Sequence, residues 1–200
     1  MLSIIIPARN ESDNLKDILD YFTKNLIDIE YEVVLINDFS NDDTFDKANS
    51  LFKSHKQFRV FDNQKKGLGG AINTGIQKSN GSKIAIMMAD LSDSPQDLVR
   101  YWEKLNEGYD CIFGSRFISG SRVTDYPRAK LFANRIVNTA IRYAFRIECN
   151  DITNAFKMYR REVIEGCQPL ISPHFNLTVE ISKVENGQDA FCRRGLFLVQ

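Results

Sequence analysis

Short apolar runs alternate with amphipathic helical patterns through the first 117 residues, and this alternation constrains the fold more than any other feature. We expect the runs to be strands, and they cover residues 2–8, 31–38, 58–63, 83–90 and 109–117. The helical patterns between them carry start signals, of which the clearest is Pro95 at a first-turn position. Nearly continuous apolar strands separated by helices are typical of a mostly parallel sheet covered on both faces. We therefore predict a doubly wound α/β fold.

The second part of the chain has a different rhythm. Residues 126–148 read as one long amphipathic helix whose basic stripe is formed by Arg128, Arg135, Arg142 and Arg146. Such a helix can lie on an anionic membrane, and it can equally present a solvated face while packing on the rest of the protein. Both interpretations stay open. At 200 residues we expect a single domain.

Charge and composition argue against several classes of partner and indicate the cellular compartment that we expect for the protein. The 26 basic and 26 acidic side chains give no net charge, so we expect no nucleic acid partner. No apolar run approaches the ~20 residues of a spanning helix, and the N-terminus does not resemble a signal peptide. The four cysteines (Cys111, Cys149, Cys167 and Cys192) form no CxxC pair, and we expect reduced thiols in a cytoplasmic protein.

Two common nucleotide-binding loops are missing. The glycines of "GLGGAINTG" do not form GxGxxG, and no GxxxxGK[ST] occurs, which argues against a Rossmann oxidoreductase and a P-loop enzyme. The two histidines, His55 and His174, are isolated from each other and from any evident serine partner. A histidine-based hydrolase or zinc enzyme is therefore not indicated.

Acidic side chains follow the expected strands. Asp38 comes after the second run, and Asp90 and Asp93 come after the fourth. Ligands of parallel sheets bind at the carboxyl ends of the strands, and carboxylates there can bind Mg²⁺ or Mn²⁺ together with substrate phosphates. For Asp93 or Ser92 the alternative is to cap the helix that starts at Pro95.

Basic residues complement these acids. Lys65 and Lys66 precede a glycine-containing helix start, where free N–H groups favour a phosphate. A lysine-rich turn is the alternative. Arg116 follows the fifth strand, where its guanidinium can bind a phosphate with two parallel hydrogen bonds.

Six sequence blocks, in order, resemble the inverting family 2 glycosyltransferases of the GT-A fold, especially the polyprenyl-phosphate (dolichol-phosphate mannose synthase) branch. The opening "SIIIPARNESDNL" resembles a strand followed by P-x-x-N-E, and "INDFSNDDT" resembles D-D-x-S-x-D-x-T. "GLGGAINTG" is similar to a glycine-containing third motif, and "MMADLSDSP" stands where many members have D-A-D-L-x-x-P. "GSRF" and "DITNAFKMYRRE" resemble the G-S-R and D-x-T-x-x-F-[RK]-x-Y blocks, so the likeness spans about residues 2–180.

The resemblance implies a role for each matched residue. Residues 1–120 would be the nucleotide-sugar-binding half of one glycosyltransferase domain spanning residues 1–200, and residues 121–200 the acceptor side. The implied contacts to the base and ribose of the donor come from Pro7, Ala8, Asn10, Glu11, Asp38, Lys66, Gly67 and Leu68. The implied metal ligands for Mg²⁺ or Mn²⁺ are Asp90 with Ser92 or Asp93. Arg116 and Lys157 would face phosphates, with Asp151 and Thr153 in the acceptor site.

Three positions depart from the family pattern. Met88 stands in place of the first acid of D-x-D, and Asn37 in place of the first acid of the D-D pair. The tail "ENGQDAFCRRGLFLVQ" lacks the R-x-x-G-x-S-K element.

The implied activity is sugar transfer from a nucleoside diphosphate sugar, such as GDP-mannose or a UDP-sugar, to a polyprenyl phosphate at the inner face of the membrane. An acceptor phosphate is already ionised, so no strong base is needed, and Arg116 assists the departing diphosphate. An acceptor hydroxyl would instead require a carboxylate base, for which Asp151 is the first candidate. The alternatives are a saccharide or protein acceptor, and a non-catalytic nucleotide-sugar binder.

Overall fold

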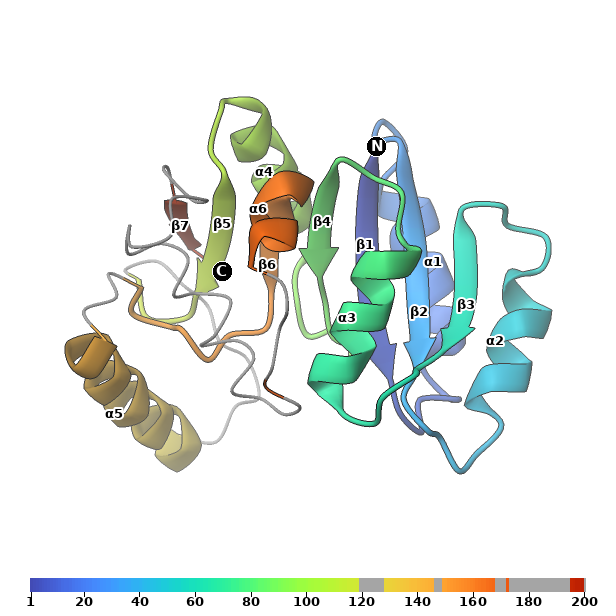
Figure 1. Ribbon diagram of the computed structural model, residues 1–200, viewed down its shortest axis with the longest axis horizontal. Helices are drawn as coiled ribbons and strands as arrows, with labels where there is room; N and C mark the ends of the chain where they lie inside the picture. The colour runs from blue at the N-terminus through green and yellow to red at the C-terminus, as the bar shows by residue number, and fades with distance from the viewer. Residues whose placement is uncertain (119–127, 146–148, 168–171, 173–194, 200) are drawn as a thin grey trace.

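The computed structural model describes residues 1–118, 128–145, 149–167, 172 and 195–199. In this part of the chain the strands form one sheet in the order β3-β2-β1-β4-β6-β5-β7 (Figure 1). The strands are β1 (Leu2–Ala8), β2 (Tyr31–Asn37), β3 (Phe58–Asp62), β4 (Lys83–Ile86), β5 (Cys111–Ser115), β6 (Lys157–Arg160) and β7 (Gly195–Val199). Among these described strands, β6 alone runs antiparallel to its neighbours, β4 and β5, and the other pairings are parallel. The predicted mostly parallel sheet is confirmed; β6 was not predicted.

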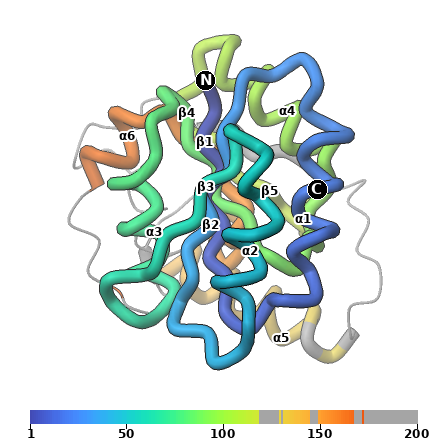
Figure 2. The backbone as a smooth tube through the Cα atoms, turned by 90° about the vertical axis from the view of Figure 1, so that its right-hand side faces the viewer, coloured from blue at the N-terminus to red at the C-terminus, as the bar shows by residue number. Residues whose placement is uncertain are grey.

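Helices cover both faces of the sheet, as predicted. They are α1 (Leu15–Asn25), α2 (Thr44–Phe52), α3 (Leu68–Lys78), α4 (Pro95–Asn106), α5 (Arg128–Phe145) and α6 (Arg161–Gly166). Helices α1, α2 and α4 contribute to one hydrophobic cluster, and α3 and α6 contribute to the other. Figure 2 shows the sheet nearly edge-on, with α3 and α6 to the left and α1 and α4 to the right.

The strands are apolar throughout because both of their faces are buried. In β1, Ile4 and Ile6 point into the cluster of α1, α2 and α4, whereas Ile5 between them points into the cluster of α3 and α6. This alternation follows from the two-residue repeat of a strand. Helix α3 packs closely on β1 at Gly75, where any Cβ would collide with the Ile5 side chain.

Two expected boundaries differ from the structure. The fourth strand ends at Ile86 rather than at Asp90, because its ladder with β1 ends at the pair Ile5 and Ile86. Helix α4 does begin at Pro95, but its N-cap is Ser94. Capping of α4 by Asp93 or Ser92 is therefore wrong.

The cysteine expectation is wrong at one position. Cys149 and Cys167 are free thiols, but Cys111 in β5 is disulfide-bonded. Cys192 and the tail from residue 185 to 194, where a family element is missing from the sequence, lie outside the described residues. None of the helices in the described ranges is long and apolar enough to cross a membrane.

Candidate active site

The carboxyl ends of β1, β2 and β4 point to the same edge of the sheet, the lower edge in Figure 1. The loops that follow them each contain a residue with left-handed backbone: Asn10 (φ 57°), Phe39 (φ 55°) and Leu91 (φ 53°). These are the non-glycine residues of positive φ within the described ranges. Backbone of this kind costs on the order of 1–3 kcal/mol and clusters at functional sites. The predicted residues Asn10, Glu11, Asp38, Asp90, Ser92 and Asp93 lie in and beside these loops.

The loops after β1 and β2 are tied to each other. The Asn10 N–H donates to Ser40 Oγ (3.0 Å), and the Asn41 N–H donates back to Asn10 Oδ1 (2.8 Å). The Glu11 N–H donates to Thr44 Oγ1 (2.9 Å) at the start of α2. Asn10 is exposed and Glu11 is half-buried at this rim, whereas Pro7 and Ala8 are buried in β1. Of these four residues predicted to contact the donor, Asn10 and Glu11 present side chains at the edge, whereas Pro7 and Ala8 do not.

Asp38 joins the end of β2 to the start of α3. Its buried carboxylate accepts hydrogen bonds at Oδ1 from the Gly67 N–H (2.8 Å) and from Asn63 Nδ2 (2.7 Å). Gly67 has a φ of 109°, a conformation that favours glycine, and it is the N-cap of α3. Lys66 is exposed and Leu68 is half-buried on either side of it. The predicted donor-binding residues of α3 are therefore held against the end of β2 by Asp38.

A pocket of about 550 Å³ collects most of the predicted metal and phosphate residues. It is lined by Met88, Asp90, Ser92, Asp93, Arg116, Asn134, Val137, Thr153, Asn154 and Ala155. These residues come from the loop after β4, the end of β5, helix α5 and the segment before β6. The pocket therefore joins the predicted donor side to the predicted acceptor side.

The acidic side of this pocket offers oxygen ligands. Asp90 is exposed and its Oδ1 accepts the Ser92 N–H (3.1 Å), while the Asp93 side chain is buried. The described residues contain no group of three or more acidic, histidine or cysteine side chains able to hold a metal. Two carboxylates and one hydroxyl nevertheless fit Mg²⁺ or Mn²⁺, which take hard oxygen ligands and complete their shells with water and substrate phosphates.

The Asp93 backbone is anchored from α1. The Tyr21 hydroxyl donates to the Asp93 carbonyl oxygen (2.8 Å). Burial raises the pKa of Tyr21 far above its ordinary value, and the nearby carboxylates of Asp93 and Asp97 raise it further. The phenol therefore stays a neutral donor at any physiological pH, and it fixes the chain between Asp90 and α4.

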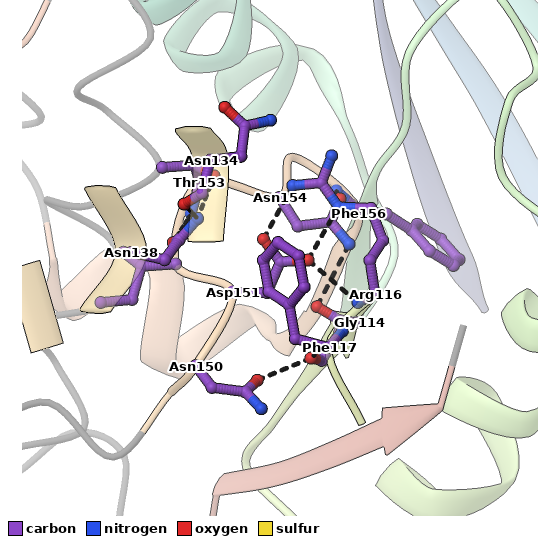
Figure 3. A network of polar contacts seen from close by, with 12 residues as sticks. Gly114, Arg116, Phe117, Asn134, Asn138, Asn150, Asp151, Thr153, Asn154 and Phe156 are labelled. Atoms are coloured by element: carbon purple, nitrogen blue, oxygen red, sulfur yellow. Dashed lines mark hydrogen bonds and ion pairs between the residues drawn. The ribbon is translucent and has the colours of Figure 1, made fainter. Parts of the chain in front are cut away.

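Arg116 and Asp151 form a bidentate ion pair on the other side of the pocket (Figure 3). Arg116 Nε donates to Asp151 Oδ2 (2.8 Å), Arg116 Nη2 donates to Oδ1 (2.7 Å), and the Arg116 backbone N–H also reaches Oδ2 (2.9 Å). Asp151 is fully buried, whereas the Arg116 side chain is 19% exposed. Both carboxylate oxygens are thus engaged by Arg116, an arrangement that does not favour Asp151 as a base, and its catalytic role stays a prediction.

The segment before β6 also holds α5. Asn138 on α5 donates from Nδ2 to Thr153 Oγ1 (2.9 Å) and accepts the Thr153 N–H at Oδ1 (3.0 Å). Asn154 Nδ2 donates to the Gly114 carbonyl oxygen (3.1 Å) at the end of β5. Figure 3 shows these contacts side by side with the pair of Arg116 and Asp151. One short segment thereby positions the arginine and the helix.

Sequence reasoning missed Asn134 and Asn138, which face the pocket segment from α5. The signal was available, because residues 131, 134, 138 and 141 recur at helical spacing and are the less exposed face of α5. Two asparagines on an inward face indicate specific hydrogen bonding rather than a purely apolar contact.

Lys157 does not occupy the place expected of it. It is 1% exposed in β6, its Nζ donates to the Ile152 carbonyl oxygen (3.0 Å), and it lies 5.3 Å from the centre of the Phe113 ring. Lys157 does not line the pocket, so a direct phosphate contact is not supported. Side chains alternate between the two faces of β6, and this alternation decides which way the Lys157 side chain points. The spacing of residues in the sequence motif does not show it.

A mostly parallel sheet with a polar pocket at the carboxyl edge, bounded by acids on one side and an arginine on the other, is the architecture of a GT-A glycosyltransferase. Residues 3–167 match the family model of glycosyl transferase family 2, and the chain belongs to this family.

Curated relatives and solved structures agree with this assignment. The chain is 29% identical over 174 residues to a dolichol-phosphate mannosyltransferase of Pyrococcus furiosus, covering 84% of this chain and 48% of the relative. It is 30% identical over 170 residues to a polyprenol monophosphomannose synthase of Mycolicibacterium smegmatis, covering 81% and 62%. The chain thus spans about half to three fifths of these relatives.

The fold is shared with more distant structures. Glucosyl-3-phosphoglycerate synthase from Mycobacterium tuberculosis, in a complex with Mn²⁺, UDP-glucose and phosphoglyceric acid, superposes with a TM-score of 0.72 at 16% identity, covering 98% of this chain and 69% of that one. Staphylococcus aureus TarS (residues 1–349) superposes with a TM-score of 0.66 at 16% identity, covering 100% and 58%.

Proposed function

We propose that the protein transfers a sugar from a nucleoside diphosphate sugar to a polyprenyl phosphate. The observation that carries the proposal is the pocket in which Asp90 and Asp93 face the same space as Arg116. Negative charge builds on the leaving diphosphate during such a transfer, so cationic stabilisation at this point lowers the barrier. The two curated relatives, whose names specify dolichol and polyprenol phosphate mannosylation, support the same substrate classes.

Asp90, Ser92 and Asp93 would hold Mg²⁺ or Mn²⁺, which as a Lewis acid would offset the charge of the donor diphosphate. Arg116 supplies a second positive group from the opposite wall. Because Asp151 fixes the guanidinium at two nitrogens, little reorganisation is needed when charge develops. The engagement of Asp151 also favours an acceptor that needs no deprotonation, and a phosphate is such an acceptor.

The exposed face of α5 favours a lipid acceptor over a soluble one. Phe132 is 68% exposed and Ile136 is 54% exposed, while the neighbouring Val137, 49% exposed, also lines the pocket. Arg135 and Arg142 are exposed on the same helix, and α5 contains no acidic residue. An apolar surface with basic residues and no acids is suited to an anionic membrane surface. Peripheral contact through α5 would present the pocket to a lipid-linked phosphate.

A non-catalytic nucleotide-sugar binder is the second candidate. It is favoured by Met88, which lines the pocket at the position where the family commonly has a carboxylate. Transfer to a saccharide or protein is the third, and it is less consistent with the paired state of Asp151.

The experiment is to replace Asp90 by asparagine and to measure both donor binding and transfer with Mn²⁺. We expect transfer to fall at least about a hundredfold, because one of two pocket carboxylates is lost. The control is Asp28→Asn, an exposed acid between the end of α1 and the start of β2, at the opposite edge of the sheet. Full metal-dependent transfer by Asp90→Asn would rule the proposal out, and binding without any transfer by the unmodified protein would select the non-catalytic alternative.

A further inference from the structure

Phe39 is the residue of this edge whose conformation the fold itself does not explain. It follows β2 with a φ of 55°, and its side chain is 47% exposed. A bulky side chain in left-handed backbone is unfavourable, and so is leaving a phenyl ring in water. The two other such residues have compensations: Asn10 accepts the Asn41 N–H, and Leu91 packs against the core. Phe39 belongs to neither core cluster and to none of the aromatic pairs found among the described residues.

The backbone on both sides of Phe39 is fixed. The Asp38 N–H donates to the Ala8 carbonyl oxygen (2.8 Å), and the Asp38 carboxylate holds the Gly67 N–H. The Ser40 N–H donates to Asn37 Oδ1 (3.3 Å), and Ser40 Oγ accepts the Asn10 N–H. An exposed ring on a backbone held at both sides is a preorganised surface, because little conformational freedom is lost when a flat ligand packs on it.

The sheet order places this ring at a suitable distance from the phosphate pocket. The strands run β2-β1-β4, so the end of β2 with Phe39 lies two strand spacings from the end of β4, whose loop carries Asp90. Two spacings are roughly 10 Å. A nucleoside at the β2 end would therefore leave its diphosphate near the acids and Arg116.

We propose that Phe39 stacks on the base of the donor nucleotide. This inference rests on the proposed function and adds an aromatic contact that the sequence resemblance did not assign. Purine and pyrimidine bases all present a π face, so the ring contributes affinity for nucleosides in general.

The test measures UDP and GDP affinity by calorimetry in the presence of Mn²⁺ for the unmodified protein, Phe39→Asn and Phe39→Tyr. Asparagine tolerates left-handed backbone and removes the ring, so the melting temperature should not fall. We expect Phe39→Asn to weaken the binding of whichever diphosphate the protein takes by about tenfold to a hundredfold. Phe39→Tyr keeps the aromatic face and should bind as the unmodified protein does. Ile27→Ala removes another exposed apolar side chain, 80% exposed, and should change nothing.

Inorganic pyrophosphate with Mn²⁺ is the probe that separates stacking from a general disturbance, because it lacks a base. Its affinity should be the same in Phe39→Asn and in the unmodified protein. Equal nucleoside diphosphate affinity in the two proteins would overturn the inference while leaving the proposed function intact. An equal loss for pyrophosphate would also overturn it, since the ring would then act through the fold. If the unmodified protein binds neither UDP nor GDP, both the inference and the proposed function fail.

Discussion

At the scale of single residues, the pair of Arg116 and Asp151 decides how the acceptor side works. A carboxylate whose two oxygens both accept from one guanidinium is a poor base and a good orienting group. We predict that Asp151→Asn lowers kcat by about tenfold to a hundredfold because the guanidinium is no longer held in place. The pH profile of kcat should keep its shape, whereas loss of a catalytic base would remove its acidic limb.

Stability offers a control for the same pair. Removing one partner of a buried ion pair leaves an uncompensated charge and costs about 3–5 kcal/mol, while removing both costs much less. Asp151→Leu should therefore lower the free energy of unfolding far more than the double variant Arg116→Met with Asp151→Leu. The double variant should fold and remain inactive, as chemical denaturation and a transfer assay would show. An active double variant would contradict the role given to Arg116.

A site residue could be predicted from the sequence where its position directly after a strand is enough to place it at the edge of the sheet. Asp90, Ser92, Asp93 and Arg116 follow strands that end at one edge, and the structure brings all four into one pocket. Pairing was not predictable: nothing in the spacing of Arg116 and Asp151 shows that they meet. The same holds for Lys157, because the direction of its side chain depends on β6, a four-residue strand inserted antiparallel between β4 and β5.

At the scale of elements, Glu32 is the buried acid that joins the strands. Its Oε1 accepts the Ser3 hydroxyl (2.7 Å) from β1, and its Oε2 accepts Arg59 Nη1 (2.8 Å) from β3. Burial on its own raises the pKa of Glu32, but hydrogen bonds from the Asn80 N–H, Ser3 and Arg59 outweigh this and lower the pKa below 4.5. The charged form is therefore the one that the fold stabilises.

The difference in the free energy of unfolding between the unmodified protein and Glu32→Gln should change with pH in a defined direction. Because the folded-state pKa is lowered, the contribution is fully present above about pH 4.5 and is lost as pH falls through the folded-state value. We predict that Glu32→Gln costs about 1–3 kcal/mol at pH 7 and that the gap to the unmodified protein narrows in acid. Urea unfolding at pH 7 and pH 3.5 measures this difference in the free energy of unfolding. A gap that widens in acid would contradict the assignment.

Two hydrogen bonds between Asn138 and Thr153 hold helix α5 to the segment before β6. We predict that Asn138→Leu weakens this attachment, since Thr153 loses both of its hydrogen bonds to the helix. The KM for the acceptor should rise about tenfold with little change in donor affinity, because Asn134 and Val137 of α5 line the acceptor side of the pocket. Asn138→Asp keeps the acceptor oxygen for the Thr153 N–H and should recover part of the loss. An unchanged acceptor KM in Asn138→Leu would contradict this attachment.

Periodicity identified the large elements because burial on both faces leaves a clear pattern. Residues 2–8 were predicted as a strand and are β1, and Pro95 does start α4. The fourth strand was predicted too long, since Met87 to Ala89 continue its apolar character after the backbone has left the ladder. Strand β6 was missed because four residues are too few for a period to be visible.

At the scale of the whole molecule, the apolar and basic residues of α5 form a surface beside the mouth of the pocket. We predict that the protein sediments with anionic liposomes at low salt and that Arg135→Gln with Arg142→Gln weakens this binding by about twenty-five-fold, or about fivefold per arginine. Phe132→Ser should weaken it as well, because the apolar term is lost. The control is Lys24→Gln with Lys47→Gln, two exposed lysines on α1 and α2. Equal sedimentation of the arginine variant and the unmodified protein would contradict membrane contact through α5.

The most direct test of the central claim is to measure which acceptor receives the sugar. Purified protein is incubated with Mn²⁺ and a labelled nucleoside diphosphate sugar, using GDP-mannose and UDP-glucose in parallel, with either a polyprenyl phosphate or soluble saccharides as acceptor. We predict label in the organic phase only when the polyprenyl phosphate is present, and none after Arg116→Met. Label transferred to a soluble saccharide, with no lipid-linked product from any donor that binds, would contradict the account.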